Sequence, residues 1–279
     1  MIDGKRSGAY GLAIDFAGSE EVLVAAPSTW QQWRFAYRVE NCEVEPHEEW
    51  GPSAAVLRML PTGTAFLDRN SRTTTFSVPV MPPPEAFVHP HLGSTAVAVG
   101  QWSGHATFHA SSFVNGGGVW GVLGGRGHGK SSTIAWLHVA GVEIMADDLL
   151  VASHGVVFAG PRCLDLRESA AEHFGIGDDI GEVGSRRRWR VQLPAVDAEL
   201  PLRGWVSLAW GDEVGIRTCG AEERFAALSA NRAFLLSESH PESWLELLGL
   251  PMYELQRPRD WLHMDDAMTL LVRSTAGTL

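Results

Sequence analysis

The glycine-rich stretch at residues 124–131 is the part of this chain whose composition most directly implies chemistry. It consists of Gly124, Gly125, Arg126, Gly127, His128, Gly129, Lys130 and Ser131. This order satisfies the pattern G-x-x-x-x-G-K-[ST], in which backbone N–H groups surround phosphate oxygens, the lysine reaches the terminal phosphates and the hydroxyl holds Mg²⁺. With Ser132 beside it, the stretch predicts a nucleotide-phosphate site. The alternative is a glycine-rich turn that happens to precede a lysine.

The segments on either side favour the phosphate-binding interpretation. Residues 119–123 form a compact apolar run that predicts a buried strand. Residues 131–139 have helical character, and Gly141 stands where a helix of that length would end. Strand, glycine loop and helix follow one another in the order that a phosphate-binding loop requires.

Two adjacent acidic residues, Asp147 and Asp148, follow a predicted strand at 142–146. Carboxylates at such a strand end have two available functions beside a bound nucleotide. One carboxylate can hold Mg²⁺, and the other can accept the proton of an attacking hydroxyl. The alternative is a turn or a helix cap.

Three further residues are candidates because of where they fall in predicted strands. His109 ends the run 106–108, where a lone histidine is more often structural. Asp165 and Arg167 alternate with apolar residues and are expected on one face of a short strand. An acid and an arginine together can serve a metal and a phosphate, although a surface ion pair is the alternative.

A dense basic cluster occurs at residues 186–190, with Arg186, Arg187, Arg188 and Arg190. Glycines and acidic residues before it predict a flexible loop. Such a loop beside a nucleotide can clamp phosphates or capture an acidic substrate segment. The alternative is a solvated loop.

The elements that would position these residues divide the chain into two parts. Short apolar or alternating runs at 10–14, 22–24, 35–39, 56–60 and 73–78 predict a β-rich N-terminal region. An acidic segment at 40–49 is expected to be a loop, and a proline cluster at 80–85 is expected to be a linker. We therefore place a boundary between residues 1–84 and 85–279.

The second part alternates predicted strands and helices and is assigned to the α/β class. Strands are expected at 96–99 and 106–108, with hairpins at 151–158 and 205–217. Helices are expected at 221–236 and 241–249, where Pro241 suits a first helical turn.

Composition narrows the partners and the compartment. The 279 residues carry a formal net charge of -11, which argues against a nucleic-acid partner. Cys42, Cys163 and Cys219 form no C-x-x-C pair, so we expect no zinc site and a reducing compartment. No apolar run approaches the length of a membrane span and no signal peptide is visible, so the expectation is a cytoplasmic protein without a membrane partner.

Taken together, these motifs resemble the HPr kinase/phosphorylase family and its relatives that phosphorylate ribosomally made lasso peptides. The likeness covers residues 105–168. It consists of His109 at the family's interval before the loop, the loop itself, the tripeptide 146–148 and the leucine–acid–leucine–arginine run 164–167. Arg126, His128 and Glu168 depart from the bacterial HPr kinases, which makes the chain more similar to the peptide-tailoring relatives.

The resemblance implies an α/β fold with a phosphate-loop core, a mixed and strongly curved sheet, and a kinase that transfers the γ-phosphoryl of ATP to a serine of a peptide or protein. It implies that Lys130 and Ser131 bind phosphate and Mg²⁺ and that Asp147 is the general base. His109 and Asp148 would support the base or the phosphoryl group, with Asp148 also near the metal. Asp165 would help the metal, and Arg167 would steady the local charge. Relatives are often oligomeric, so a homo-oligomer is an expectation.

Three functions stay open at this stage. In the leading one, a peptide or protein serine kinase, the basic cluster and the N-terminal region would recognise the substrate. The second is a kinase for a small molecule, because the motifs report on ATP and the hydroxyl but not on what carries the hydroxyl. The third is a non-catalytic nucleotide-binding regulator, against which the presence of Asp147, Asp148 and His109 argues.

Overall fold

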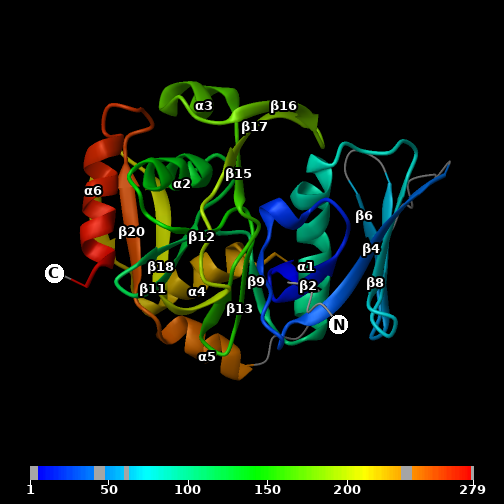
Figure 1. Cartoon of the computed structure of the whole chain (residues 1–279). Helices are drawn as coiled ribbons and strands as arrows, with labels where there is room; N and C mark the ends of the chain where they lie inside the picture. Colours follow the sequence, from blue (N-terminus) through cyan, green and yellow to red (C-terminus); the bar gives the residue numbers. More distant parts are fainter. Residues whose placement is uncertain (1–5, 41–47, 60–62, 234–240, 278–279) are drawn as a thin grey trace.

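The computed structural model describes residues 6–40, 48–59, 63–233 and 241–277, and it is a mixed α/β protein with two large mixed sheets. In Figure 1 one large sheet lies on the right, the other lies on the left with most of the helices, and helix α1 stands between them. A small three-stranded sheet lies along the top of this view. The mixed α/β class expected from the sequence is therefore confirmed, whereas the curvature of the sheet stays a prediction.

The first sheet is built from the N-terminal part of the chain. Its eight strands have the order β3-β1-β2-β4-β8-β7-β6-β5, with β4 parallel to both β2 and β8. The elements are β1 (Ser7–Ala9), β2 (Leu12–Asp15), the short helix η1 (Glu20–Val22), β3 (Val24–Ala25), β4 (Gln31–Val39), β5 (Glu49–Trp50), β6 (Ala54–Arg58), β7 (Thr64–Asp68) and β8 (Thr73–Val78).

The second sheet has nine strands and contains the phosphate-loop motif. Its main order is β12-β10-β11-β18-β14-β13-β9, and β20 pairs with both β18 and β19. The strands are β9 (Ala106–Phe108), β10 (Ser111–Asn115), β11 (Gly118–Leu123), β12 (Ile144–Ala146), β13 (Leu150–Ser153), β14 (Val156–Phe158), β18 (Glu199–Trp210), β19 (Gly215–Thr218) and β20 (Met252–Arg257).

The third sheet has the order β15-β17-β16 and is antiparallel. Its strands are β15 (Cys163–Leu166), β16 (Asp178–Val183) and β17 (Arg186–Gln192). The helical segments are η2 (Phe87–His91), α1 (Leu92–Trp102), α2 (Lys130–Val139), α3 (Glu168–Phe174), α4 (Ala221–Ala230), α5 (Pro241–Gly249) and α6 (Met264–Thr275). No helix among the described residues is long and apolar enough to cross a membrane.

Reciprocal tryptophan–glycine pairs fix the register of β11, the strand that leads into the glycine loop. Trp120 of β11 lies opposite Gly204 of β18, and Gly121 lies opposite Trp205. A Cβ atom added to Gly121 or to Gly204 would lie 2.5 Å from the ring of the opposing tryptophan. Only glycine leaves room for these rings, so the two glycines favour the observed register of the two strands.

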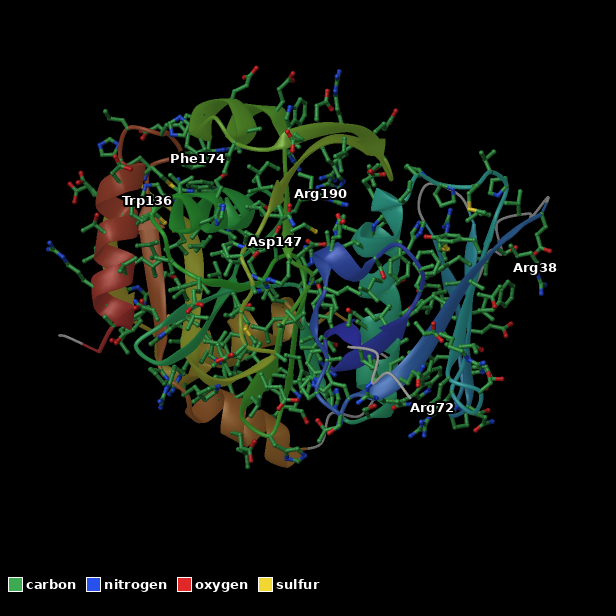
Figure 2. All side chains as sticks on the ribbon, in the orientation of Figure 1. Arg38, Arg72, Trp136, Asp147, Phe174 and Arg190 are labelled. Atoms are coloured by element: carbon green, nitrogen blue, oxygen red, sulfur yellow. The ribbon has the colours of Figure 1, made fainter. Side chains whose placement is uncertain are left out.

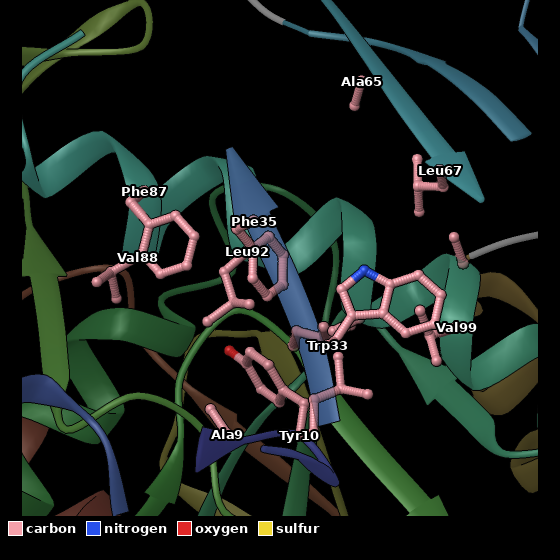
Figure 3. Close-up of a cluster of buried hydrophobic side chains, with 14 of the residues drawn as sticks. Ala9, Tyr10, Trp33, Phe35, Ala65, Leu67, Phe87, Val88, Leu92 and Val99 are labelled. Carbon is pink, nitrogen blue, oxygen red and sulfur yellow. The ribbon is translucent and has the colours of Figure 1, made fainter. Parts of the chain in front are cut away.

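Helix α1 is buried between the two large sheets. Leu92 and Val99 belong to a cluster that also contains Trp33 and Phe35 of β4 (Figure 3). Trp33 satisfies its buried indole N–H by donating to Thr74 Oγ1 at 2.8 Å. Because the same cluster includes Val151 of the second sheet, the apolar core is continuous across the predicted boundary at residues 84 and 85.

Several predicted elements are confirmed. The strand before the glycine loop, the helix after it and the strand before the acidic pair correspond to β11, α2 and β12. The hairpin at 151–158 forms between β13 and β14. The runs at 35–39 and 73–78 lie in strands β4 and β8.

Other predicted elements are wrong. The strand expected at 96–99 is part of helix α1, whose burial on both sides removes the one-sided apolar periodicity of a surface helix. The hairpin at 205–217 does not form, because β20 lies between β18 and β19. The run 22–24 is split between η1 and β3, and the predicted helix at 221–236 ends at Ala230.

Some sequence expectations fall where the structure is not described. Cys42, most of the acidic segment 40–49, Leu60 of the run 56–60 and residues 234–236 of the predicted helix lie outside the described residues. Cys163 and Cys219 are buried free thiols.

Candidate functional site

The glycine loop joins β11 to α2 and adopts a backbone conformation that favours glycine. Gly127 has φ +88° and Gly129 has φ +85°, both in the left-handed region. Gly129 is the N-cap of α2, so the loop ends at the helix N-terminus. First-turn N–H groups lack helical partners, and the helix dipole favours negative charge there, so this end of α2 suits a phosphate.

His128, an unusual residue for such a loop, anchors the loop to the sheet. Its ring Nδ1 lies 3.0 Å from the carbonyl oxygen of Leu208 in β18. The side chain also packs against Gly124 and Gly125: a Cβ added to Gly124 would lie 3.1 Å from His128 Cβ, and one added to Gly125 would lie 3.4 Å from its ring Nε2. The side chain therefore anchors the loop to β18, and His128 is not part of the lining of the cavity described below.

Lys130 is buried at the start of α2, where its ammonium group donates to the carbonyl oxygen of Gly124 at 2.6 Å. Burial lowers the pKa of this ammonium group, and the charges of Asp148 and Asp147 oppose that shift. A ligand phosphate would offer the ammonium a charged acceptor in place of the carbonyl.

Asp147 lies at the end of β12, near the centre of the molecule (Figure 2). Its Oδ1 accepts a hydrogen bond from Ser111 Oγ at 2.6 Å. Burial, together with the negative charge of Asp148, raises the pKa of the Asp147 carboxyl to about 7. A carboxyl group with this pKa can take up and release a proton near neutral pH.

Asp148 has φ +66°, a left-handed conformation that is uncommon for residues other than glycine. This backbone turns its carboxylate toward two histidines. Oδ1 lies 3.5 Å from His109 Nδ1, and Oδ2 lies 3.6 Å from His89 Nδ1. His89 belongs to η2, where its own backbone is extended, and burial lowers its pKa.

Asp165 of β15 is paired with arginine. Its two carboxylate oxygens accept hydrogen bonds from Arg190 at 2.8 Å and 2.9 Å, and Arg188 Nη1 lies 4.0 Å from Oδ2. The carboxylate is thereby occupied, which does not fit the expected role as a metal ligand. Arg167 lies just beyond β15 as the N-cap of α3, and not on the strand face shared with Asp165.

The basic cluster at 186–190 is strand β17 and not the flexible loop expected from the sequence. Carboxylates from neighbouring strands neutralise part of its charge: Arg190 pairs with Asp165 of β15, and Arg187 pairs with Asp179 of β16. The turn that joins β16 to β17 reaches the η2 segment, since a Cβ added to Gly184 would lie 3.9 Å from Pro90. In Figure 1 these strands arch over the top of the molecule toward α1.

One cavity of about 680 Å³ collects these groups, a size typical of small-ligand sites. The candidate residues that line it are His109, Gly125, Gly127, Gly129, Lys130, Ser131, Ser132, Asp147, Asp148, Asp165, Arg167, Arg186, Arg187 and Arg188. Gly124, His128 and Arg190 are not part of the lining.

The same cavity is lined by residues that the sequence did not single out as site residues. Tyr10 and His89 enter from the N-terminal side, and Tyr10 Oη lies 3.5 Å from the carbonyl oxygen of Asp147. Trp210 and Arg257 line the other side, with the guanidinium carbon 4.5 Å from the ring centroid. Each comes from a segment far from the loop in sequence. For Arg257, the pair of arginines at 257 and 259 was a weak signal.

The arrangement places an anion-binding loop and a titratable carboxyl in one cavity. Arg257 adds to the cationic side, because its guanidinium is buried and its one side-chain hydrogen bond within the described residues is a long one of 3.5 Å to the Pro258 carbonyl oxygen. Such an arrangement can hold a phosphorylated ligand at one end and withdraw a proton at the other.

Comparisons with known proteins give a distant likeness only. No protein-family model matches the sequence, and no curated protein matches it. Among solved structures, the HPr(Ser) kinase/phosphatase from Coxiella burnetii is similar over 60% of this chain and 95% of its own, with 14% identity and a TM-score of 0.31. A likeness this distant assigns neither a family nor an activity to this chain.

Proposed function

We propose that this protein is an ATP-dependent kinase that transfers the γ-phosphoryl group to the hydroxyl of a serine in a peptide or protein. The observation that carries the proposal is the Asp147 carboxyl, with a pKa raised to about 7, in the same cavity as the glycine loop and Lys130. Phosphoryl transfer to a hydroxyl needs this combination of phosphate binding and a nearby proton acceptor.

On the donor side, the N-terminus of α2 binds the phosphates. The backbone N–H groups of the loop and of Ser131 and Ser132 donate to phosphate oxygens, and Lys130 exchanges its bond to Gly124 for one to a terminal phosphate. Arg257, whose guanidinium has N–H groups available, neutralises further phosphate charge on the same side. Together these groups stabilise the charge that moves toward ADP during transfer.

On the acceptor side, Asp147 takes the proton. Ser111 Oγ donates to Oδ1 of this carboxylate, and the serine hydroxyl of the substrate would donate its proton to the same carboxylate. As the serine hydroxyl oxygen of the substrate forms a bond to the γ-phosphorus, the bond from the γ-phosphorus to the bridging oxygen of ADP breaks. The hydroxyl proton passes to Asp147. Asp148, held between His89 and His109, fixes the strand end that carries Asp147.

The donor set fits Mg²⁺ bound together with the nucleotide. No group of three histidine, cysteine or acidic side chains among the described residues forms a metal cage. Magnesium commonly takes only one or two protein oxygens and completes its shell with phosphates and water. Ser131 and Asp148 would hold it here, and it would neutralise phosphate charge. Because Asp165 is paired with Arg190, we assign it a structural function instead.

The N-terminal region is proposed to help recognise the substrate. Tyr10 lines the cavity on the side of Asp147, and η2 contributes Val88, His89 and Pro90 from just beyond that region. A substrate that presents a hydroxyl to Asp147 would therefore contact this side of the cavity.

The proposal is tested by separating ATP binding from transfer. Asp147→Asn keeps the shape of the side chain but removes the proton acceptor, so we expect normal ATP affinity by calorimetry and a loss of transfer of about 10²–10⁴-fold. Lys130→Ala is expected to weaken ATP binding itself. Asp212→Asn, at an exposed position outside the cavity lining, is the matched control and should behave as the wild type. Full turnover by Asp147→Asn would refute the assignment of the base.

A further inference from the structure

Arginine side chains line the cavity in a protein whose net charge is -11. We define the rim as Arg126 of the glycine loop, Arg167 after β15, and Arg186, Arg187 and Arg188 of β17, all of which line the cavity. These five side chains come from three separate segments of the chain. Their convergence brings like charges together, which is unfavourable unless an anion compensates.

Only part of this charge is compensated within the protein. Arg187 pairs with Asp179, and Arg188 lies 4.0 Å from Asp165. Arg126, Arg167 and Arg186 make no ion pair with any acidic side chain among the described residues. Three guanidinium groups thus remain available to an external anion.

The three unpaired arginines form one cluster. Burial is the largest cause that lowers the pKa of Arg186, and the positive charges of Arg126 and Arg167 are the next largest. Asp148 acts on the same guanidinium in the opposite direction, which places Arg186 within electrostatic reach of Asp148. An anion held by this cluster would therefore lie beside the place where the acceptor hydroxyl must sit.

The paired strands β16 and β17 position Arg186 of this cluster. Arg186, Arg188 and Arg190 alternate along β17 and so share one face of it. Arg190 and Asp165 fasten that face to β15, and the turn at Gly184 rests near Pro90. Arg186 is thereby carried on a braced strand and not on a free loop.

We propose that the rim recognises an acidic peptide segment, with carboxylates of the segment held by Arg126, Arg167 and Arg186 next to the serine that is phosphorylated. This inference rests on the proposed kinase function and names its substrate class. The nucleotide phosphates have the loop N–H groups, Lys130 and Arg257 as partners, which leaves the rim for the acceptor.

The test measures peptide binding without requiring transfer. A fluorescein-labelled peptide with a serine between glutamates is compared, by fluorescence anisotropy in the presence of ADP, with a peptide in which glutamines replace the glutamates. We expect the acidic peptide to bind at least about tenfold more tightly, and added salt to remove the difference. The double variant R126Q/R186Q should lose the preference. Arg38→Gln removes an exposed charge far from Asp147 (Figure 2) and should keep the preference.

Two results would overturn the inference. One is equal binding of the two peptides by the wild type. The other is an unchanged preference for the acidic peptide in the double variant, and a fall in ADP affinity of that variant would then assign the rim to the nucleotide. Neither result bears on the kinase proposal, which fails separately if the wild type transfers no phosphoryl group.

Discussion

At the residue scale, the ionisation of the buried Asp147 carboxyl destabilises the folded protein, and its raised pKa suits the carboxyl to accept a proton. Its carboxyl has a pKa of about 7 in the folded protein, against an ordinary value of 3.8. The folded state therefore binds the proton more tightly than the unfolded state. As pH rises from about 4 to 7, the unfolded state loses the proton first, and this group contributes progressively less to stability.

The direction of this pH dependence gives a prediction for Asp147→Asn that can be tested without knowing the substrate. The amide carries no charge to desolvate, so the variant should unfold at a higher temperature than the wild type at pH 8. For a chain of this size, each kcal/mol relieved corresponds to about 2–4 °C. The gain should shrink as the pH falls toward 4, because the folded wild type then keeps its proton and the unfolded state approaches its ordinary pKa of 3.8. Calorimetric scans at both pH values measure the difference in unfolding temperature between the variant and the wild type. If this difference is less favourable to the variant at pH 8 than at pH 4, the burial argument is contradicted.

At the scale of elements, the glycine loop needs Gly129 both for its positive φ and for the space that Arg257 occupies. Gly141, which shares only the first property, serves as a control. Both residues have positive φ, at +85° and +80°. A Cβ on Gly129 would lie 2.6 Å from Arg257 Nη2, whereas a Cβ on Gly141 would meet nothing within 4 Å. Each alanine substitution is expected to cost about 1–2 kcal/mol of stability from backbone strain. Only the change at Gly129 should displace Arg257.

We therefore expect Gly129→Ala to lower ATP affinity by about tenfold, and Gly141→Ala to leave it unchanged at a similar loss of stability. Calorimetric titration of each variant with ATP at a temperature where both are folded measures the difference. Equal ATP affinities in the two variants would show that Arg257 does not take part in nucleotide binding.

The elements also show what the sequence could and could not predict. The loop, its strand and its helix were predicted because their signals are local: glycines, an apolar run and a helix end. Residues 186–190 were misread because the carboxylates that neutralise them, Asp165 and Asp179, belong to other strands. His89 gave no signal at all, since only the tertiary fold brings it to Asp148.

At the scale of the whole molecule, the two large sheets share one core through α1. Leu92 and Val99 pack against Trp33 and Phe35 on one side, while Val151 of the second sheet belongs to the same cluster (Figure 3). The boundary predicted at residue 84 from the proline cluster would therefore cut through a continuous apolar core. A linker composition cannot reveal this, because the contacts that span it lie far apart in sequence.

A shared core predicts one cooperative unfolding transition for the full chain. Leu92→Ala, at a fully buried position, should destabilise the protein by about 2–5 kcal/mol and shift that single transition as a whole. Calorimetry together with tryptophan fluorescence follows both parts at once. Two separated transitions, of which Leu92→Ala shifts only one, would show that the parts fold independently.

The most direct test of the central claim is mass spectrometry of a library of acidic serine peptides after incubation with Mg·ATP. We predict that the wild type adds the mass of one phosphoryl group to serine, at a rate that rises with pH through about 7 as Asp147 loses its proton. Asp147→Asn, which binds ATP equally well, should phosphorylate the peptides about 10²–10⁴-fold more slowly. Phosphorylation by Asp147→Asn at the wild-type rate, or tight ATP binding by the wild type with no phosphorylated peptide, would contradict the account.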